Sequence, residues 1–177
     1  MSLSADGNTA AVGANIANGH TGGVWIWTRS GGIWSQQGPM LVGSGAVGNA
    51  EQGISVSLSA DGDTLGVGAP SDNNEIGAVW IWTRNGGIWF QQGSKLLASD
   101  AVGSARQGQS VSLSADGNTA VVGGIHDNTN TGAVWVWTRT AGVWTQQGPK
   151  LVGTGAVGPA EQGRSVSVSA DGNTAIV

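Results

Sequence analysis

Ser-Leu-Ser-Ala-Asp-Gly occupies residues 2–7, 57–62 and 112–117, and Ser-Val-Ser-Ala-Asp-Gly occupies residues 167–172. Each copy begins 55 residues after the one before it. Gln-Gln-Gly keeps the same spacing and begins at residues 36, 91 and 146. A regular repeat of this kind is typical of propellers, solenoids and arrays. We therefore predict one structural unit per repeat, with the units packed on one another.

The third repeat predicts four strands. Residues 109–114 alternate between polar and apolar, which is the period of a half-buried strand. Asp116-Gly117 follows and indicates a hairpin, because both residue types tolerate a positive φ. The remaining predicted strands are 119–123, 133–138 and 143–147, separated by a polar loop at 126–132 and a turn at 140–142.

Four short strands in a meander are the pattern of one propeller blade. The predicted fold class is all-β: a propeller-like repeat of four-stranded antiparallel blades, either open or completed between chains. The predicted organisation is blade 1 at residues 1–56, blade 2 at 57–111, blade 3 at 112–166, and a partial fourth repeat at 167–177 that serves as a strand-pairing tail. Residues 156–163 are the one candidate for a helical turn, and their glycines argue against anything longer.

Two tryptophans separated by one residue mark the third predicted strand of every repeat. Side chains two apart in a strand point to the same side, so each pair shares a face and the flanking aliphatic residues lie on the other. Such indoles favour packing between blades over a sugar-stacking surface. Trp34, Trp89 and Trp144 lie on the predicted fourth strand, where both interpretations stay open. The predicted structural core consists of Trp25, Trp27, Trp80, Trp82, Trp135 and Trp137.

The second repeat carries Gln52-Gly53 before its first strand and Gly68-Ala69-Pro70 after its second. This arrangement resembles the FG-GAP repeat, which is named for Phe-Gly before the first strand and Gly-Ala-Pro after the second. The resemblance implies a β-propeller like that of integrin α chains and of many bacterial surface proteins. Gln stands in place of Phe at positions 52, 107 and 162, and Gly-Ala-Pro is complete only in this repeat.

Composition narrows the range of partners. The formal net charge is −4 and no basic cluster is present, so we expect no nucleic-acid partner. No apolar run approaches the ~20 residues of a spanning helix, so we expect no membrane insertion. Cysteine is absent, which excludes disulfides, thiolate chemistry and cysteine-ligated zinc.

Calcium enters through the resemblance, because many integrin-type repeats carry a loop of Asp and Asn oxygens. A calcium ion needs about 6–8 oxygen ligands. The hairpins of this chain offer one carboxylate each, at Asp6, Asp116 or Asp171, and two in the second repeat at Asp61 and Asp63. We expect no calcium and no other cofactor.

The third predicted strand ends in Trp-Thr-Arg, on the same side of the unit as the Asp-Gly hairpin. We therefore predict a structural ion pair between these Asp and Arg residues in each repeat, worth at most ~1 kcal/mol if exposed. The predicted pairs are Asp6 with Arg29, Asp61 with Arg84, and Asp116 with Arg139.

The copies differ most after the second strand, at residues 15–21, 71–76 and 125–131. Loops on a rigid scaffold commonly carry binding residues, although drift in an unconstrained loop would give the same variation. The candidate ligand-binding residues, for a glycan or a protein ligand, are Asn18, His20, Asp72, Asn74, His126 and Asn128.

Catalytic patterns are weak in this sequence. Serine is plentiful, but no Gly-x-Ser-x-Gly motif accompanies it. A carboxylate pair of the glycosidase type could involve Asp72 and Glu75, yet it occurs in one repeat only. We expect no enzymatic activity.

Three repeats fall short of a closed propeller, which has about four to eight blades. Residues 165–177 copy a first and a second strand without a third and a fourth. Open strand edges invite pairing with another chain, and contact between two different ends is head-to-tail. A piece of a longer repeat protein would show the same edges.

The leading hypothesis is a non-catalytic structural or adhesive repeat protein that self-associates head-to-tail into a ring or filament. We expect it to be extracellular or at the cell surface; no signal peptide is visible, and an incomplete N-terminus would hide one. The alternative is a lectin-like, carbohydrate-binding propeller that uses the variable loops and the outer tryptophans.

Overall fold

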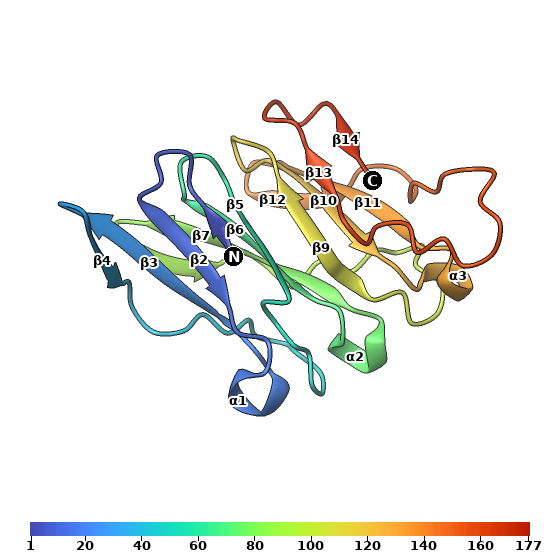
Figure 1. Ribbon diagram of the computed structural model, residues 1–177, viewed down its shortest axis with the longest axis horizontal. Helices are drawn as coiled ribbons and strands as arrows, with labels where there is room; N and C mark the ends of the chain where they lie inside the picture. Colours follow the sequence, from blue (N-terminus) through green and yellow to red (C-terminus); the bar gives the residue numbers. More distant parts are fainter.

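The computed structural model describes residues 1–177 and is built almost entirely of antiparallel strands (Figure 1). The all-β prediction is confirmed: three four-stranded sheets follow one another, and a two-stranded hairpin comes last. Each sheet keeps its strands in chain order, as a meander does. We call the three sheets blades 1, 2 and 3.

The strand bounds are close to those that the alternation predicts. Blade 1 holds β1 (Ser2–Leu3), β2 (Thr9–Gly13), β3 (Val24–Ser30) and β4 (Ile33–Gln36). Blade 2 holds β5 (Ser55–Leu58), β6 (Thr64–Ala69), β7 (Ala78–Asn85) and β8 (Ile88–Gln91). Blade 3 holds β9 (Gln107–Leu113), β10 (Thr119–Gly124), β11 (Ala133–Thr140) and β12 (Val143–Gln146), and the final hairpin holds β13 (Ser167–Val168) and β14 (Ala175–Ile176).

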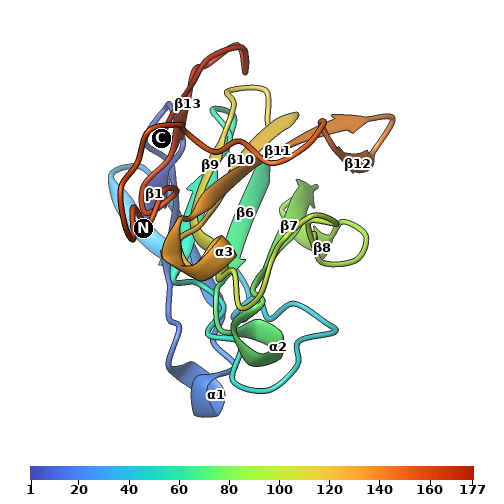
Figure 2. The same cartoon turned by 90° about the vertical axis from the view of Figure 1, so that its right-hand side faces the viewer.

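The blades stand side by side, with their first strands in a row (Figures 1 and 2). One backbone hydrogen bond links each Asp-Gly hairpin to the next: Ala5 N–H donates to Ala60 O, Ala60 to Ala115 and Ala115 to Ala170, each at 2.9 Å. The final hairpin therefore sits on blade 3 as blade 3 sits on blade 2. The sheets do not close on themselves.

In blades 2 and 3 the tryptophan pair faces the preceding blade. Trp80 and Trp82 pack with Val24 and Ile26 of blade 1 in one buried cluster. Trp135 and Trp137 are likewise buried, in a second cluster against blade 2 that includes Val79 and Ile81. The aliphatic residues on the third strand of one blade thus pack against the indoles on the third strand of the next blade. Both faces of blade 2 are therefore buried.

Trp25 and Trp27 correct the prediction that all six indoles form the core, because both are only half-buried. Their face of blade 1 has no blade against it in this structure. Burial of a repeated residue depends on its neighbour, so identical positions differ in exposure along the stack.

Close backbone approach explains two glycines of each repeat. A Cβ atom on Gly13 would lie 2.0 Å from the carbonyl oxygen of Gly53, and one on Gly68 would lie 2.1 Å from that of Gly108. A glycine at or next to the end of the second strand therefore packs on the glycine that precedes the first strand of the next blade. These are the two glycines that carry the FG-GAP resemblance.

Gln52 stands where the FG-GAP repeat has Phe, and its side chain bonds to the backbone of the connection between blades. Gln52 is buried, accepts a hydrogen bond from Gly43 N–H at 2.6 Å and donates one to Gly43 O at 3.1 Å. It thereby satisfies an otherwise unpaired stretch of the long connection between blades, which a phenyl ring could not do.

The variable loops, predicted as irregular, share one backbone shape. Each holds a four-residue turn, α1 (Ala17–His20), α2 (Asp72–Glu75) or α3 (Asp127–Asn130), and all three lie at the same edge of the molecule (Figure 1). The last three residues of every turn have φ between 48° and 70°. The turns are therefore left-handed, which suits the Asn and Gly residues that dominate them. Residues 156–163 form no helix.

Thr129→Asn is expected to stabilise the protein by about 1 kcal/mol, because β-branched Thr129 holds a φ of 55° that Asn tolerates better. Thermal and urea unfolding would measure the gain. The matched control is Asn74→Thr, which places Thr at the same position of the second turn and should destabilise by a similar amount. A neutral result for both changes would contradict the assignment of strain.

Candidate self-association interface

The contact between blades occurs twice with mostly the same parts, and the acceptor of the buried indole's N–H is the main difference. Trp80 Nε1 donates to Ser44 O of blade 1 at 2.8 Å. Trp135 Nε1 donates to Asp100 Oδ1 of blade 2, also at 2.8 Å. Each buried indole is thus oriented by the long connection of the preceding blade.

A second group lies at the outer strands. Gln37 Oε1 of blade 1 accepts from Trp89 Nε1 at 3.1 Å and from Arg84 Nη1 at 3.4 Å, while the guanidinium lies over the indole, 5.4 Å from its centroid. Blade 3 repeats this arrangement on Gln92 of blade 2. The corresponding contacts are Trp144 Nε1 to Gln92 at 2.9 Å, Arg139 Nη1 to Gln92 at 3.0 Å, and Arg139 over Trp144 at 5.3 Å.

The prediction that each arginine pairs with the aspartate of the Asp-Gly hairpin is wrong, because each arginine bonds to a residue two positions further along. Arg84 Nε pairs with Asp63 at 2.6 Å, two residues beyond the predicted Asp61. In the other blades the same nitrogen donates to an Asn side chain, from Arg29 to Asn8 at 3.1 Å and from Arg139 to Asn118 at 2.8 Å. The hairpin aspartates are occupied by their own turn, so the next polar side chain faces the arginine.

That turn is visible at Asp6, whose carboxylate accepts from Ser4 Oγ at 2.6 Å, Asn8 N–H at 2.9 Å and Asn8 Nδ2 at 3.1 Å. The bond from Ser4 contributes most to lowering the pKa of Asp6 from 3.8 to about 2. Serine and Asn hydrogen bonds also lower the pKa of Asp116 and of Asp171. Gly7, not Asp6, takes the positive φ of the hairpin.

These lowered pKa values set an acid dependence. A carboxyl whose folded pKa is depressed contributes stability above its unfolded pKa and loses that contribution as pH falls through the folded value. We therefore expect the melting temperature to be flat above about pH 5 and to fall between about pH 4 and 2. NMR titration of Asp6 should show a midpoint near the value of about 2. A midpoint near 3.8 would contradict the hydrogen-bonded turn.

Asp72, a candidate ligand-binding residue, is instead buried at the interface. Its carboxylate is fully buried, accepts from Val47 N–H of blade 1 at 2.8 Å and pairs with Lys95 Nζ at 2.5 Å. Asp127 repeats both contacts, with Val102 N–H at 2.7 Å and Lys150 at 2.5 Å. Asp72 therefore faces the protein interior, and Glu75, half-exposed, lies 3.7 Å from Arg106.

The other candidate loop residues lie on the exposed left-handed turns. Asn18, Asn74 and Asn128 are exposed, His126 is half-buried, and His20 is exposed with its Nδ1 3.7 Å from Glu51. The stack distributes them over three loops, with Asn18 and His20 in the first, Asn74 in the second, and His126 and Asn128 in the third, so the structure does not bring all five together. No group of three or more His, Cys, Asp or Glu side chains is arranged to hold a metal ion.

Each outer face of the stack carries the residues of one side of this interface, without the residues that face them in the two inner contacts. On blade 1, Arg29 is exposed and Trp34 is 39% exposed. Arg29 Cζ lies over Trp34, 5.6 Å from its centroid, as in the inner blades. On blade 3, Gln147, the counterpart of Gln37 and Gln92, is exposed.

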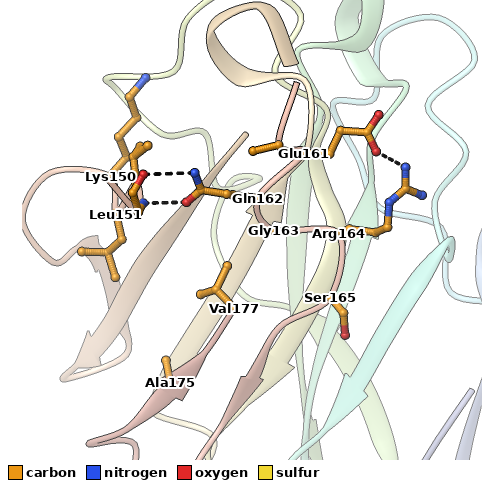
Figure 3. Close-up of a pocket in the computed structure, with 12 residues that line it drawn as sticks. Lys150, Leu151, Glu161, Gln162, Gly163, Arg164, Ser165, Ala175 and Val177 are labelled. Atoms are coloured by element: carbon orange, nitrogen blue, oxygen red, sulfur yellow. Dashed lines mark hydrogen bonds and ion pairs between the residues drawn. The ribbon is translucent and has the colours of Figure 1, made fainter. Parts of the chain in front are cut away.

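Beside the final hairpin, blade 3 opens into a cavity of about 820 Å³ (Figure 3). Leu151 and Gly153 line one side, and Gln162 and Gly163 line the other. Gln162 bonds to Gly153 through Oε1 and Nε2, at 2.5 Å and 3.3 Å, as Gln52 bonds to Gly43 in blade 1. The repeated Gln-Gln-Gly was the sequence signal for part of this interface, and its role became clear only with the indoles in place.

Comparisons with known proteins agree with this architecture. The family profile described as the FG-GAP repeat matches residues 89–137, which confirms the predicted resemblance there. No curated protein sequence matches the chain. The crystal structure of TolB from Acinetobacter baumannii is similar, with a TM-score of 0.52 and 12% identity over 98% of this chain. The chain spans 35% of that structure's length, and the likeness shows a β-propeller fold. No helix of this chain has the length and hydropathy to cross a membrane.

Proposed function

We propose that the chain is a non-catalytic structural repeat protein that self-associates head-to-tail, with blade 1 of one copy against blade 3 of the next. One observation carries the proposal. The same interface occurs between blades 1 and 2 and between blades 2 and 3, and its two halves are left unfilled on the outer faces of the stack.

Most of the unmatched groups on the two outer faces are complementary. By the 55-residue spacing, Gln147 would accept from Arg29 and Trp34 as Gln37 accepts from Arg84 and Trp89. Thr154 O would accept from Trp25 Nε1 as Ser44 O accepts from Trp80. Two different surfaces meet in this contact, so it generates a ring if the rotation closes and a filament if it does not.

The junction lacks one element of the inner interfaces. Blade 1 has Ala17 and Met40 where the other blades have the buried pairs Asp72 with Lys95 and Asp127 with Lys150. Val157, the counterpart of Val47, would therefore remain without a carboxylate partner. We expect the junction to be weaker than the interfaces within a chain, so that assembly depends on concentration.

The setting and the absence of catalysis are parts of this proposal. The resemblance to repeats of bacterial surface proteins and integrin α chains supports an extracellular or cell-surface location and an adhesive role. Burial of Asp72 beneath Lys95 removes one half of the only carboxylate pair that the sequence offered to an enzyme.

Sedimentation velocity over a range of concentrations tests the proposal. We expect species well above the 17.7 kDa monomer, growing with concentration, and rings or fibres in electron micrographs. Trp25→Ala should reduce assembly, whereas Ser30→Ala, an exposed change on the same strand, should not. A pure monomer at about 100 µM, where an interface worth ~5.5 kcal/mol would be half-occupied, would contradict it.

The alternative is a carbohydrate-binding propeller, and one observation favours it. A cleft recurs at both interfaces, beside Trp89 with Gln37 and beside Trp144 with Gln92. We place this function second because each indole already donates its N–H and carries an arginine on one face. A glycan array with no signal above background would remove it.

A further inference from the structure

The residues that line the cavity on blade 3 are the counterparts of residues that surround Trp80 at the interface of blades 1 and 2. In blade 1 the position of Gly153 is held by Gly43, where an added Cβ would lie 2.2 Å from Cδ1 of the Trp80 ring, and in blade 2 it is held by Ala98. The positions of Leu151 and Gln162 are held in blade 1 by Leu41, which packs against the buried cluster of Trp80, and by Gln52. A Trp-x-Trp strand fills this place twice in the molecule, and on blade 3 the place is open (Figure 3).

The final hairpin supplies the edge to which such a strand would pair. Thr174 turns its carbonyl to Ser169 N–H inside the hairpin. Backbone groups alternate in direction along a strand, so the next residue, Ala175, turns its N–H and C=O to the free edge of β14. In blade 1 the counterpart of Ala175 is Ala10, which lies opposite Trp27 of β3.

A second copy can add its whole blade 1 beside that edge only if β13 and β14 leave blade 3, because its own hairpin needs the same place. The two hairpins are nearly the same sequence, however. Residues 167–177 differ from residues 2–12 only by Val168 for Leu3 and Ile176 for Ala11. Each also bonds to the blade beside it, but on opposite sides: Val168 N–H donates to Ser112 Oγ of the preceding blade at 3.2 Å, and Ser2 Oγ accepts from Leu58 N–H of the following blade at 3.0 Å.

We propose that the two copies share one blade by hairpin exchange, an inference that rests on the proposed self-association. β13 and β14 of one copy replace hairpin 2–12 of the next copy and pair with its β3, so that each chain contributes two of the four strands. Carried over from blade 1, the register places Ala175 opposite Trp27, Ile176 opposite Ile26 and Val177 opposite Trp25.

The exchange keeps the backbone pairs of β3, places Ile176 where Ala11 is fully buried, and gains a buried face. The incoming hairpin makes the same backbone pairs to β3 as the outgoing one, because the residues correspond. Trp25 and Trp27 of the second copy then enter the open site of the first and cover Leu151, which is 50% exposed in the single chain. Apolar burial of this kind is the net driving force.

Cysteine cross-linking tests the register without background, since the chain has no cysteine. Ile26→Cys/Ile176→Cys should form a disulfide between chains on oxidation, seen as multimers in non-reducing gels and as a linked peptide pair by mass spectrometry. Ala11→Cys/Ile26→Cys is the control, because Ala11 lies opposite Ile26 within one chain. Its link should lock the hairpin in place and abolish assembly. Reduction should restore assembly.

A second pair of variants asks the same question without thiols. Ala175→Pro removes the N–H at the free edge and should prevent assembly while leaving the melting temperature of the monomer nearly unchanged. Ala10→Pro removes the matching N–H of the hairpin to be displaced and should increase assembly. Wild-type protein that assembles, with the two introduced thiols of the Ile26→Cys/Ile176→Cys variant unlinked and Ala175→Pro without effect, would overturn hairpin exchange and leave head-to-tail association standing. Wild-type protein that stays monomeric would overturn both.

Discussion

Trp80→Ala should lower the free energy of unfolding by about 3–5 kcal/mol, the usual loss when a fully buried indole is removed. Trp80 is 0% exposed, donates its N–H to Ser44 O and seats its ring against Gly43. The substitution therefore removes apolar contact, leaves a cavity between blades 1 and 2, and unpairs a carbonyl. Because small domains are stable by only about 5–15 kcal/mol, much of the molecule's stability would be lost.

Trp25→Ala is the matched control, since Trp25 holds the same position one repeat earlier and is only half-buried. Its cost in dilute, monomeric protein should be smaller, about 1–2 kcal/mol. Urea unfolding followed by circular dichroism measures the loss for both variants. We expect the dependence of the unfolding free energy on urea concentration to be the same in each. Equal losses would show that stacking of blades does not supply the burial, whereas a loss at Trp25 that grows with protein concentration would report the junction between copies.

The comparison of these two residues shows what periodicity can and cannot predict. Alternation of polar and apolar residues located the strands of every blade, because one face of a strand is set by local pattern. The partial exposure of Trp25 was not predicted. The repeat gives equivalent positions the same prediction, whereas the burial of this residue depends on whether another blade packs against it.

The electrostatic partners were harder to predict for a different reason. Charge and sheet geometry placed Arg84 near the Asp-Gly hairpin, which is correct, but the choice between Asp61 and Asp63 depends on which carboxylate the turn already uses. Ser59 Oγ donates to Asp61 at 2.5 Å, and Asp63 is left for Arg84. Such competition within four residues becomes visible only when the backbone of the turn is known.

The left-handed turns and the buried carboxylates of the loops were missed because their sequences look variable. The signal that could have found the carboxylates is a coupled change: Asp72 occurs with Lys95 and Asp127 with Lys150, while the first repeat has Ala17 with Met40. An acid and a base that come and go together, 23 residues apart, indicate a contact.

Asp72→Ala is expected to destabilise the protein by about 3–5 kcal/mol, because breaking a buried ion pair leaves the other charge without a partner. Lys95 is 14% exposed and would keep an ammonium in a site that no longer holds its carboxylate. Val47 N–H would lose its acceptor as well. Lys95→Met alone should cost a similar amount, since it strands Asp72, which is fully buried.

The double variant Asp72→Ala/Lys95→Met should recover most of that loss, because it rebuilds in blade 2 the Ala17 and Met40 arrangement that blade 1 already tolerates. A residual cost of about 1 kcal/mol is expected for the unpaired Val47 N–H. The comparison is a double-mutant cycle on Asp63→Ala and Arg84→Met, in which the coupling between the two side chains should stay below about 1 kcal/mol because Asp63 is 51% exposed, although Arg84 is not. If the two single changes at positions 72 and 95 simply add in the double variant, the buried pair is not a coupled unit. The difference between blade 1 and its neighbours would then have to be explained without it.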